Sequence, residues 1–129
     1  MTGGALLRMR FTAADLPILR LRVADAGAAA GLDQARCDEL VLAVYELACN
    51  AILHGGGGGS LLLTRAEDSV RCRVSDEGPG FASTAARSGG GLWLAEQLTD
   101  ALEIDGPEAG GAIVTLMVHC RSNSRQLTD

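Results

Sequence analysis

The stretch LVLAVYELACNAILH, residues 40–54, contains no Gly or Pro and is rich in Leu and Ala, so it predicts a helix that ends at Gly55. Its nearly continuous apolarity predicts burial on more than one face. Glu46, Asn50 and His54 are spaced four residues apart and therefore form one polar stripe along this buried helix. Burial of a carboxylate or an amide costs roughly several kcal/mol unless the group finds a partner. Either protein groups or a ligand with its metal ion must satisfy the stripe, and we expect a ligand.

The charge of the chain excludes several classes of site. The 129 residues carry a formal net charge of -5, and all eleven basic residues are arginine. Because the chain has no lysine, it cannot have the lysine of a P-loop, the strand lysine of eukaryotic-type kinases or a Schiff-base lysine. Any bound phosphate would have to be neutralised by Mg²⁺, backbone N–H groups or Arg. The chain has no long run of basic residues, which argues against direct binding of nucleic acid. Residues 1–22 hold four Arg and one Asp, which indicates either an acidic protein partner or, more simply, scattered surface arginines.

The cysteines and the apolar runs bear on the compartment. Cys37, Cys49, Cys72 and Cys120 form no C-x-x-C pair and no zinc spacing, so we expect them to be reduced and buried. No signal-peptide core is visible, and no run approaches the ~20 apolar residues of a membrane span. We therefore expect a cytoplasmic protein with no membrane segment. Its length predicts a single domain over residues 1–129, with a disordered tail at 121–129.

Hydrophobic periodicity predicts the order of the elements. Strands are expected over residues 6–12, 60–64, 69–75, 102–105 and 112–118, and helices over 15–30, 34–54 after an Asp33 cap, and from 92 along a stripe that reaches Leu102. Gly55 is expected to be a left-handed C-cap, and residues 56–59 a mobile turn. This order predicts an α+β two-layer sandwich: one mostly antiparallel, mixed sheet covered on one face by about three helices.

Two further motifs accompany the polar stripe. DEGPGF, residues 76–81, places Asp76 at the end of a strand, and GGGLWLAEQLTD, residues 89–100, opens a helix with glycines. Between them lies a short, small-residue segment that we expect to be a mobile lid. Together with ELACNAILHG, these motifs resemble the Bergerat-fold ATP-binding domain of gyrase, histidine kinases and mismatch-repair ATPases. Within that superfamily they look most like the bacterial anti-sigma-factor serine/threonine kinases, and the resemblance covers residues 11–118.

The resemblance implies a role for each matching residue. Asn50 would ligate Mg²⁺, Asp76 would accept a hydrogen bond from the adenine amino group, and Glu46 would be the catalytic general base. Further nucleotide-binding residues implied by the motifs are Gly78 and Gly80 beside the base, Arg87 at the γ-phosphate, and Gly89, Gly90, Gly91 and Leu92 around the phosphates. The cofactors implied are ATP and Mg²⁺.

The function implied by the resemblance is that of a Mg·ATP-dependent anti-sigma factor. It would bind a sigma factor, phosphorylate Ser or Thr of an anti-anti-sigma antagonist protein, and form a homodimer. Two alternatives stay open: a non-catalytic nucleotide-binding switch module, and a related switch kinase that activates a phosphatase. Two departures from the family pattern bear on this choice. The first is that Ala112 follows Gly111 where the family carries threonine; Thr115 is a poor substitute, because it lies on the opposite face of the strand. The second is that the lid offers few side chains to hold the γ-phosphate.

Overall fold

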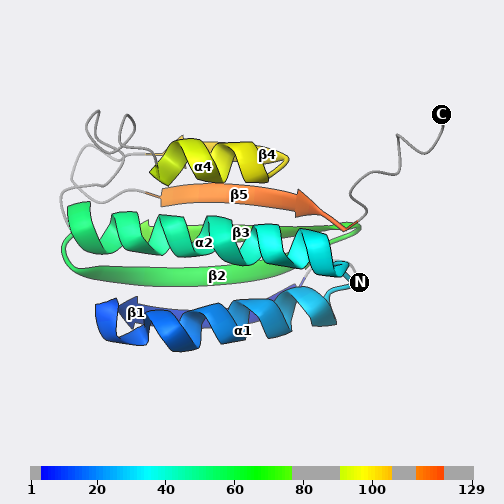
Figure 1. Cartoon of the computed structure of the whole chain (residues 1–129), viewed down its shortest axis with the longest axis horizontal. Coiled ribbons are helices and arrows are strands. Elements are labelled where there is room, and N and C mark those ends of the chain that lie inside the picture. The colour runs from blue at the N-terminus through cyan, green and yellow to red at the C-terminus, as the bar shows by residue number, and fades with distance from the viewer. Residues whose placement is uncertain (1–3, 77–90, 106–112, 121–129) are drawn as a thin grey trace.

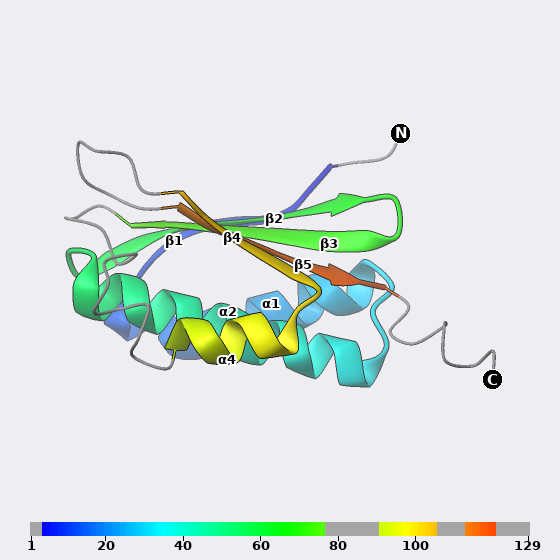
Figure 2. The same ribbon diagram turned by 90° about the horizontal axis from the view of Figure 1, so that it is seen from above.

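A five-stranded sheet with helices on one face makes up the part of the chain that the computed structural model describes, residues 4–76, 91–105 and 113–120 (Figures 1 and 2). The elements are β1 (Gly4–Thr12), the 3₁₀ turn η1 (Ala13–Asp15), α1 (Leu16–Ala29), α2 (Gln34–His54), β2 (Gly58–Ala66), β3 (Ser69–Asp76), α4 (Gly91–Leu98), β4 (Ala101–Asp105) and β5 (Ile113–His119). The strands are ordered β1-β2-β3-β5-β4, and every pairing among them is antiparallel. The predicted α+β sandwich is confirmed, with α1, α2 and α4 on one face of the sheet.

Helix α2 forms because a capped, glycine-free segment carries a wide apolar surface. The predicted cap is present: Oδ1 of Asp33 accepts a hydrogen bond of 2.8 Å from the backbone N–H of Arg36. The side chains of Leu40, Val44 and Leu47 are fully buried. Helix α2 packs between α1 and α4 and also contacts the sheet below it, so it is buried on several faces, as its apolarity predicts (Figure 1).

Strand β3 shows the predicted alternation. Val70, Cys72 and Val74 are fully buried under the helices, whereas Arg71 and Arg73 are exposed on the other face. Side chains of a strand alternate between the two faces of a sheet, so the helical layer accounts for this pattern. The apolar segment predicted to be a central strand is β5, which pairs with β3 on one side and β4 on the other.

The glycine run differs from the prediction. Gly55 has a φ of -117°, so it is not a left-handed cap; positive φ occurs at Gly56 (98°) and Gly57 (96°) instead. Gly58 and Gly59 are buried residues of β2, so the predicted mobile turn over residues 56–59 is wrong in its second half. The reason is tertiary: β2 pairs with β1 and β3 as far as these residues, and a Cβ at position 59 would lie 2.2 Å from the backbone oxygen of Ser75.

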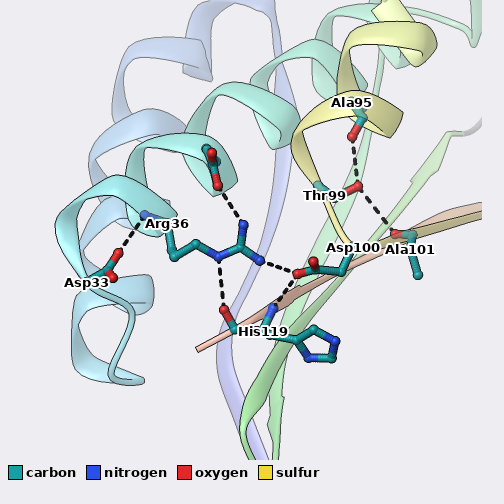
Figure 3. Close-up of polar contacts among 8 residues, drawn as sticks. Asp33, Arg36, Ala95, Thr99, Asp100, Ala101 and His119 are labelled. Atoms are coloured by element: carbon teal, nitrogen blue, oxygen red, sulfur yellow. Dashed lines mark hydrogen bonds and ion pairs between the residues drawn. The ribbon is translucent and has the colours of Figure 1, made fainter. Parts of the chain in front are cut away.

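The last described helix is also shorter than its apolar stripe. Leu102, expected on the stripe, lies instead in β4. The Thr99 hydroxyl donates a 2.8 Å hydrogen bond to the carbonyl of Ala95 in the last turn of α4 (Figure 3). The backbone N–H of Asp100 then donates to the carbonyl of Met117 at 2.9 Å, which begins the pairing with β5. Sheet pairing therefore outweighs the helical periodicity at this point.

A buried ionic network lies at the end of the molecule where α2 begins. Arg36 is 8% exposed and forms ion pairs with Glu39 and Asp100. Its Nε also donates to the backbone oxygen of His119 at 3.2 Å, and Asp100 accepts a 2.8 Å hydrogen bond from the His119 N–H (Figure 3). One arginine thus joins α2, the α4–β4 turn and the end of β5. Arg36 was not predicted to be important, because two of its partners, Asp100 and His119, are far from it in the chain.

Candidate nucleotide site

The polar residues of α2 do not form a uniformly buried stripe. Asn50 is 8% exposed, but Glu46 is only half-buried and His54 is exposed, so the prediction of a stripe inside the core holds for Asn50 alone. The physical reason for the exposure of Glu46 is that it lines an open groove between α1 and α2. Asn50 Nδ2 donates a 2.9 Å hydrogen bond to the backbone oxygen of Glu46. The amide donor is therefore used within the helix, and the amide oxygen is the atom that remains for a ligand.

Glu46 lies in an open groove between α1 and α2. The groove has a volume of about 710 Å³, and its lining consists of Pro17, Arg20, Leu21, Ala24, Asp38, Val41, Leu42, Tyr45 and Glu46. The Arg20 guanidinium lies 5.3 Å from the centre of the Tyr45 ring, a cation–π contact across the groove. Burial and the neighbouring Glu46 carboxylate both raise the pKa of the Cys49 thiol. The carboxylate of Glu46 is thus accessible to another molecule from the α1 side.

Asp76 is a buried carboxylate at the end of β3. It is 8% exposed and pairs with Gly59 across the sheet. The C-cap of α2, Gly55, packs directly against it: a Cβ at position 55 would lie 2.5 Å from Oδ2 of Asp76. Glycine is therefore required where α2 ends above the strand. From the sequence, Gly55 was expected only to end the helix; as the first residue of the five-glycine run it gave no separate signal for this second role.

The site residues that the structure describes gather at one end of the molecule. Helix α2 finishes there, β3 ends there at Asp76, and α4 begins there at Gly91 (Figure 1). Gly91 is the first residue of α4, as the glycine-rich helix start predicts, and Leu92 follows it in the helix. The remaining predicted nucleotide-binding residues lie outside the described residues: Gly78, Gly80, Arg87, Gly89 and Gly90. The predicted lid, apart from Gly91, and the tail over residues 121–129 also lie outside them.

This arrangement can be compared with known families. A model of the family described as "Histidine kinase-like ATPase domain" matches residues 9–118, which include every described element except the first residues of β1 and the end of β5. The chain is a histidine kinase-like ATPase domain. None of the curated proteins matches it. Membership places the chain in the GHKL superfamily and implies that the domain binds ATP, usually together with Mg²⁺.

The residues of this ATPase domain are compatible with a magnesium ion. Mg²⁺ prefers oxygen ligands, keeps several waters and is commonly held by one or two protein groups together with phosphate oxygens. Within residues 4–76, 91–105 and 113–120, no three His, Cys, Asp or Glu side chains gather into a metal site. The Nδ2 of Asn50 forms a hydrogen bond within the helix, so its amide oxygen remains available, as a site with a single protein ligand requires.

Of the helices within residues 4–76 and 91–105, none has the length and apolarity to cross a membrane.

Proposed function

We propose that this ATPase domain is a protein serine/threonine kinase resembling the bacterial anti-sigma-factor kinases. It would hold a sigma factor and, with Mg·ATP, phosphorylate a Ser or Thr of an anti-anti-sigma antagonist. The observation that carries the catalytic part is the position of Glu46. Its carboxylate lies in an open groove, one helical turn before the buried Asn50, and it makes no hydrogen bond or ion pair with the described residues. The carboxylate is therefore available to take a proton from a hydroxyl that enters the groove.

The nucleotide would be held at the end of the molecule where α2 finishes. Asp76 is the proposed acceptor for the adenine amino group, because it is a carboxylate fixed at a strand end and packed against Gly55. The amide oxygen of Asn50 would ligate Mg²⁺, which when bound neutralises charge on the phosphates. The start of α4 at Gly91 would supply the backbone N–H groups that a helix leaves unpaired in its first turn, and these are suited to phosphate oxygens.

The proposed chemistry is an in-line phosphoryl transfer. The hydroxyl oxygen of the Ser or Thr forms a bond to the γ-phosphorus, and the bond from that phosphorus to the β–γ bridging oxygen breaks, so that ADP leaves. Glu46 takes the proton of the attacking hydroxyl. A helical turn separates Glu46 from Asn50, so the base would lie near the phosphates without being a ligand of the metal ion.

Labelled ATP tests this proposal directly. The purified domain would be incubated with [γ-³²P]ATP and with antagonist proteins of the anti-anti-sigma type from the same genome, and label on Ser or Thr would be measured. We expect transfer by the parent and none by Asn50→Ala. Nucleotide binding and sigma-factor binding without any transfer would favour the non-catalytic switch module. Transfer without sigma-factor binding would favour the related switch kinase that activates a phosphatase.

The assembly and the compartment are part of the same proposal. The kinases that the motifs resemble imply a homodimer acting in the cytoplasm, next to the transcription machinery. Analytical ultracentrifugation would test the dimer, with and without Mg·ATP. A monomer at micromolar concentration in both states would contradict it, while leaving the kinase assignment to the transfer assay.

A further inference from the structure

The face of the sheet opposite the helices carries an ordered arrangement of charge. Directly opposed residues of neighbouring strands point to the same face. One row across the sheet runs Arg8, Leu62, Arg73, Thr115 and Glu103, and the next runs Arg10, Ser60, Ser75, Ile113 and Asp105. The residues between these rows, including Leu61, Val74 and Val114, are buried under the helices, so both rows lie on the uncovered face. Arginines therefore occupy β1 and β3, and acids occupy the edge strand β4.

The arginines border a groove that runs along β2. The groove has a volume of about 490 Å³ and is lined by Arg8, Met9, Arg10, Ser60, Leu61, Leu62, Arg73 and Ser75. Its two walls are β1 and β3, which lie about 9–10 Å apart because neighbouring strands are about 4.8 Å apart. An α-helix with its side chains is about 10–12 Å wide. A helix lying over β2 would thus have one basic wall on each flank and Leu62 beneath it.

The spacing along the walls also matches a helix. Arg71 and Arg73 lie on the same face of β3, two residues and therefore about 6.6 Å apart. Side chains four residues apart on a helix lie about 5–6 Å from one another. Two acidic residues at this helical spacing can meet two arginines of one wall. Carboxylates are the preferred partners of guanidinium groups, which bind them through paired hydrogen bonds.

Three of the arginines on this face are not paired within the described part of the chain. Arg8, Arg71 and Arg73 are exposed, and in the described part of the chain no ion pair joins them to an acid. The chain as a whole has a net charge of -5, so the wall arginines are a local exception to its acidic character. Glu103 and Asp105 lie two strands beyond β3 and would repel an acidic segment displaced toward β4.

We propose that the groove over β2 binds an acidic helix of a partner protein. Asp or Glu side chains on one flank of that helix face Arg8, those on the other flank face Arg73 and Arg71, and an apolar residue packs on Leu62. The site is independent of the proposed kinase chemistry, because it lies on the opposite face of the sheet from α2 and its Glu46. It brings the basic N-terminal segment together with two arginines more than sixty residues later in the chain.

Synthetic helices provide the probe. An alanine-rich, fluorescein-labelled peptide would carry Leu along one stripe and Glu at i, i+4 spacing on both flanks; a matched peptide would carry Gln in place of Glu. Fluorescence anisotropy should show binding of the Glu peptide that weakens with added salt, and affinity for the Gln peptide at least about tenfold lower. Amide chemical shifts should change along β1, β2 and β3. Absence of binding by the Glu peptide, or shift changes confined to α1 and α2, would overturn the proposal.

Charge-reversal variants with equal net charge complete the test. Arg8→Glu with Arg73→Glu should lower the affinity for the Glu peptide about tenfold or more, whereas Arg22→Glu with Arg65→Glu should change it less than about twofold. Arg22 and Arg65 are exposed outside the groove. Equal losses of affinity in both double variants would show attraction by overall charge only and overturn the proposal.

If circular dichroism shows that the variant with Arg8→Glu and Arg73→Glu is unfolded, the variant with Arg8→Gln and Arg73→Gln replaces it. Tighter binding of an oligonucleotide than of the Glu peptide, lost in the same variants, would identify nucleic acid instead.

Discussion

Gly55 and Asp76 lie so close together that a Cβ on residue 55 would come within 2.5 Å of the Asp76 carboxylate. This contact joins the end of α2 to the end of β3 and holds the carboxylate at 8% exposure. The helix that carries Asn50 and the strand that carries Asp76 are therefore positioned by one another. A change at either residue should affect both the stability of the domain and its nucleotide site.

Gly55→Ala tests this relationship. The backbone at residue 55 has a negative φ, outside the left-handed region that requires glycine, so the expected effect is mainly steric. We expect the free energy of unfolding to fall by about 1–3 kcal/mol, as in other overpacked sites, and the affinity for ATP to fall with it. Urea denaturation and calorimetry measure the two quantities. Gly4→Ala is the control, since nothing lies within 4 Å of a Cβ at that position; equal effects in both variants would contradict the steric explanation.

Asp76→Asn should weaken binding of adenine nucleotides while the fold is kept. A hydrogen bond to a charged acceptor contributes about 1.5–3 kcal/mol, so we expect the Kd for Mg·ATP and Mg·ADP to rise about 10- to 100-fold. Isothermal titration calorimetry measures it. Asp68→Asn, an exposed residue of the β2–β3 turn, is the matched control and should bind as the parent does. Unchanged affinity in Asp76→Asn would show that the adenine pocket lies elsewhere.

Glu46→Gln should separate nucleotide binding from phosphoryl transfer. The substitution keeps shape and polarity but removes the base, so transfer should fall by about 10²- to 10⁴-fold while the affinity for Mg·ATP changes little. Asn50→Ala should lower both, because the metal ion loses a ligand. Glu96→Gln, at an exposed position of α4, is the control for charge. If Glu46→Gln transfers phosphate at the parent rate and only its melting temperature changes, Glu46 has a structural role.

Arg36→Ala should destabilise the domain without affecting the nucleotide site. Removal of Arg36 leaves the carboxylates of Glu39 and Asp100 without their cation. Both carboxylates are partly exposed to solvent, so we expect a loss of about 1–3 kcal/mol rather than the full cost of a buried pair. Chemical denaturation measures this loss, and Arg22→Ala, at an exposed position of α1, should change stability by less than about 0.5 kcal/mol. The network lies at the opposite end of α2 from Asn50 and Asp76 (Figure 1). A variant that folds should therefore bind Mg·ATP as the parent does, and weakened binding would reveal coupling along α2.

The stability of the domain should fall in alkaline solution. Burial raises the pKa of the Cys72 thiol far above its ordinary value of 9.0. The thiol is protonated in both states below pH 9, but above it only the unfolded state releases the proton. The free energy of unfolding should then fall by up to about 1.4 kcal/mol per pH unit for this group. Denaturation between about pH 8 and pH 10 measures the slope, which should be smaller in Cys72→Val; equal slopes would mean that other groups cause the loss.

Local patterns in the sequence were sufficient for most of the elements. The absence of Gly and Pro over residues 40–54, the Asp33 cap and the alternation of β3 all act over a few residues, and helices and strands follow from such short-range periodicity. The roles of Asn50 and Asp76 in the nucleotide site come instead from the resemblance of their motifs to a known family. Reasoning from local patterns was wrong where a remote partner decides the outcome: pairing with β1 and β3 takes Gly58 and Gly59 into β2, and pairing with β5 takes Leu102 out of the helical stripe.

The sequence by itself therefore determined the element types, the two-layer α+β class and the family motifs, because these depend on periodicity and spacing along the chain. Only the tertiary structure decided that Glu46 lies in an open groove, that Arg36 is buried among distant partners, and that Gly55 packs on Asp76. The same holds for the two basic walls over β2, whose arginines come from β1 and β3. The physical reason is that burial, ion pairing and close packing depend on distances between segments, which the order of residues alone does not specify.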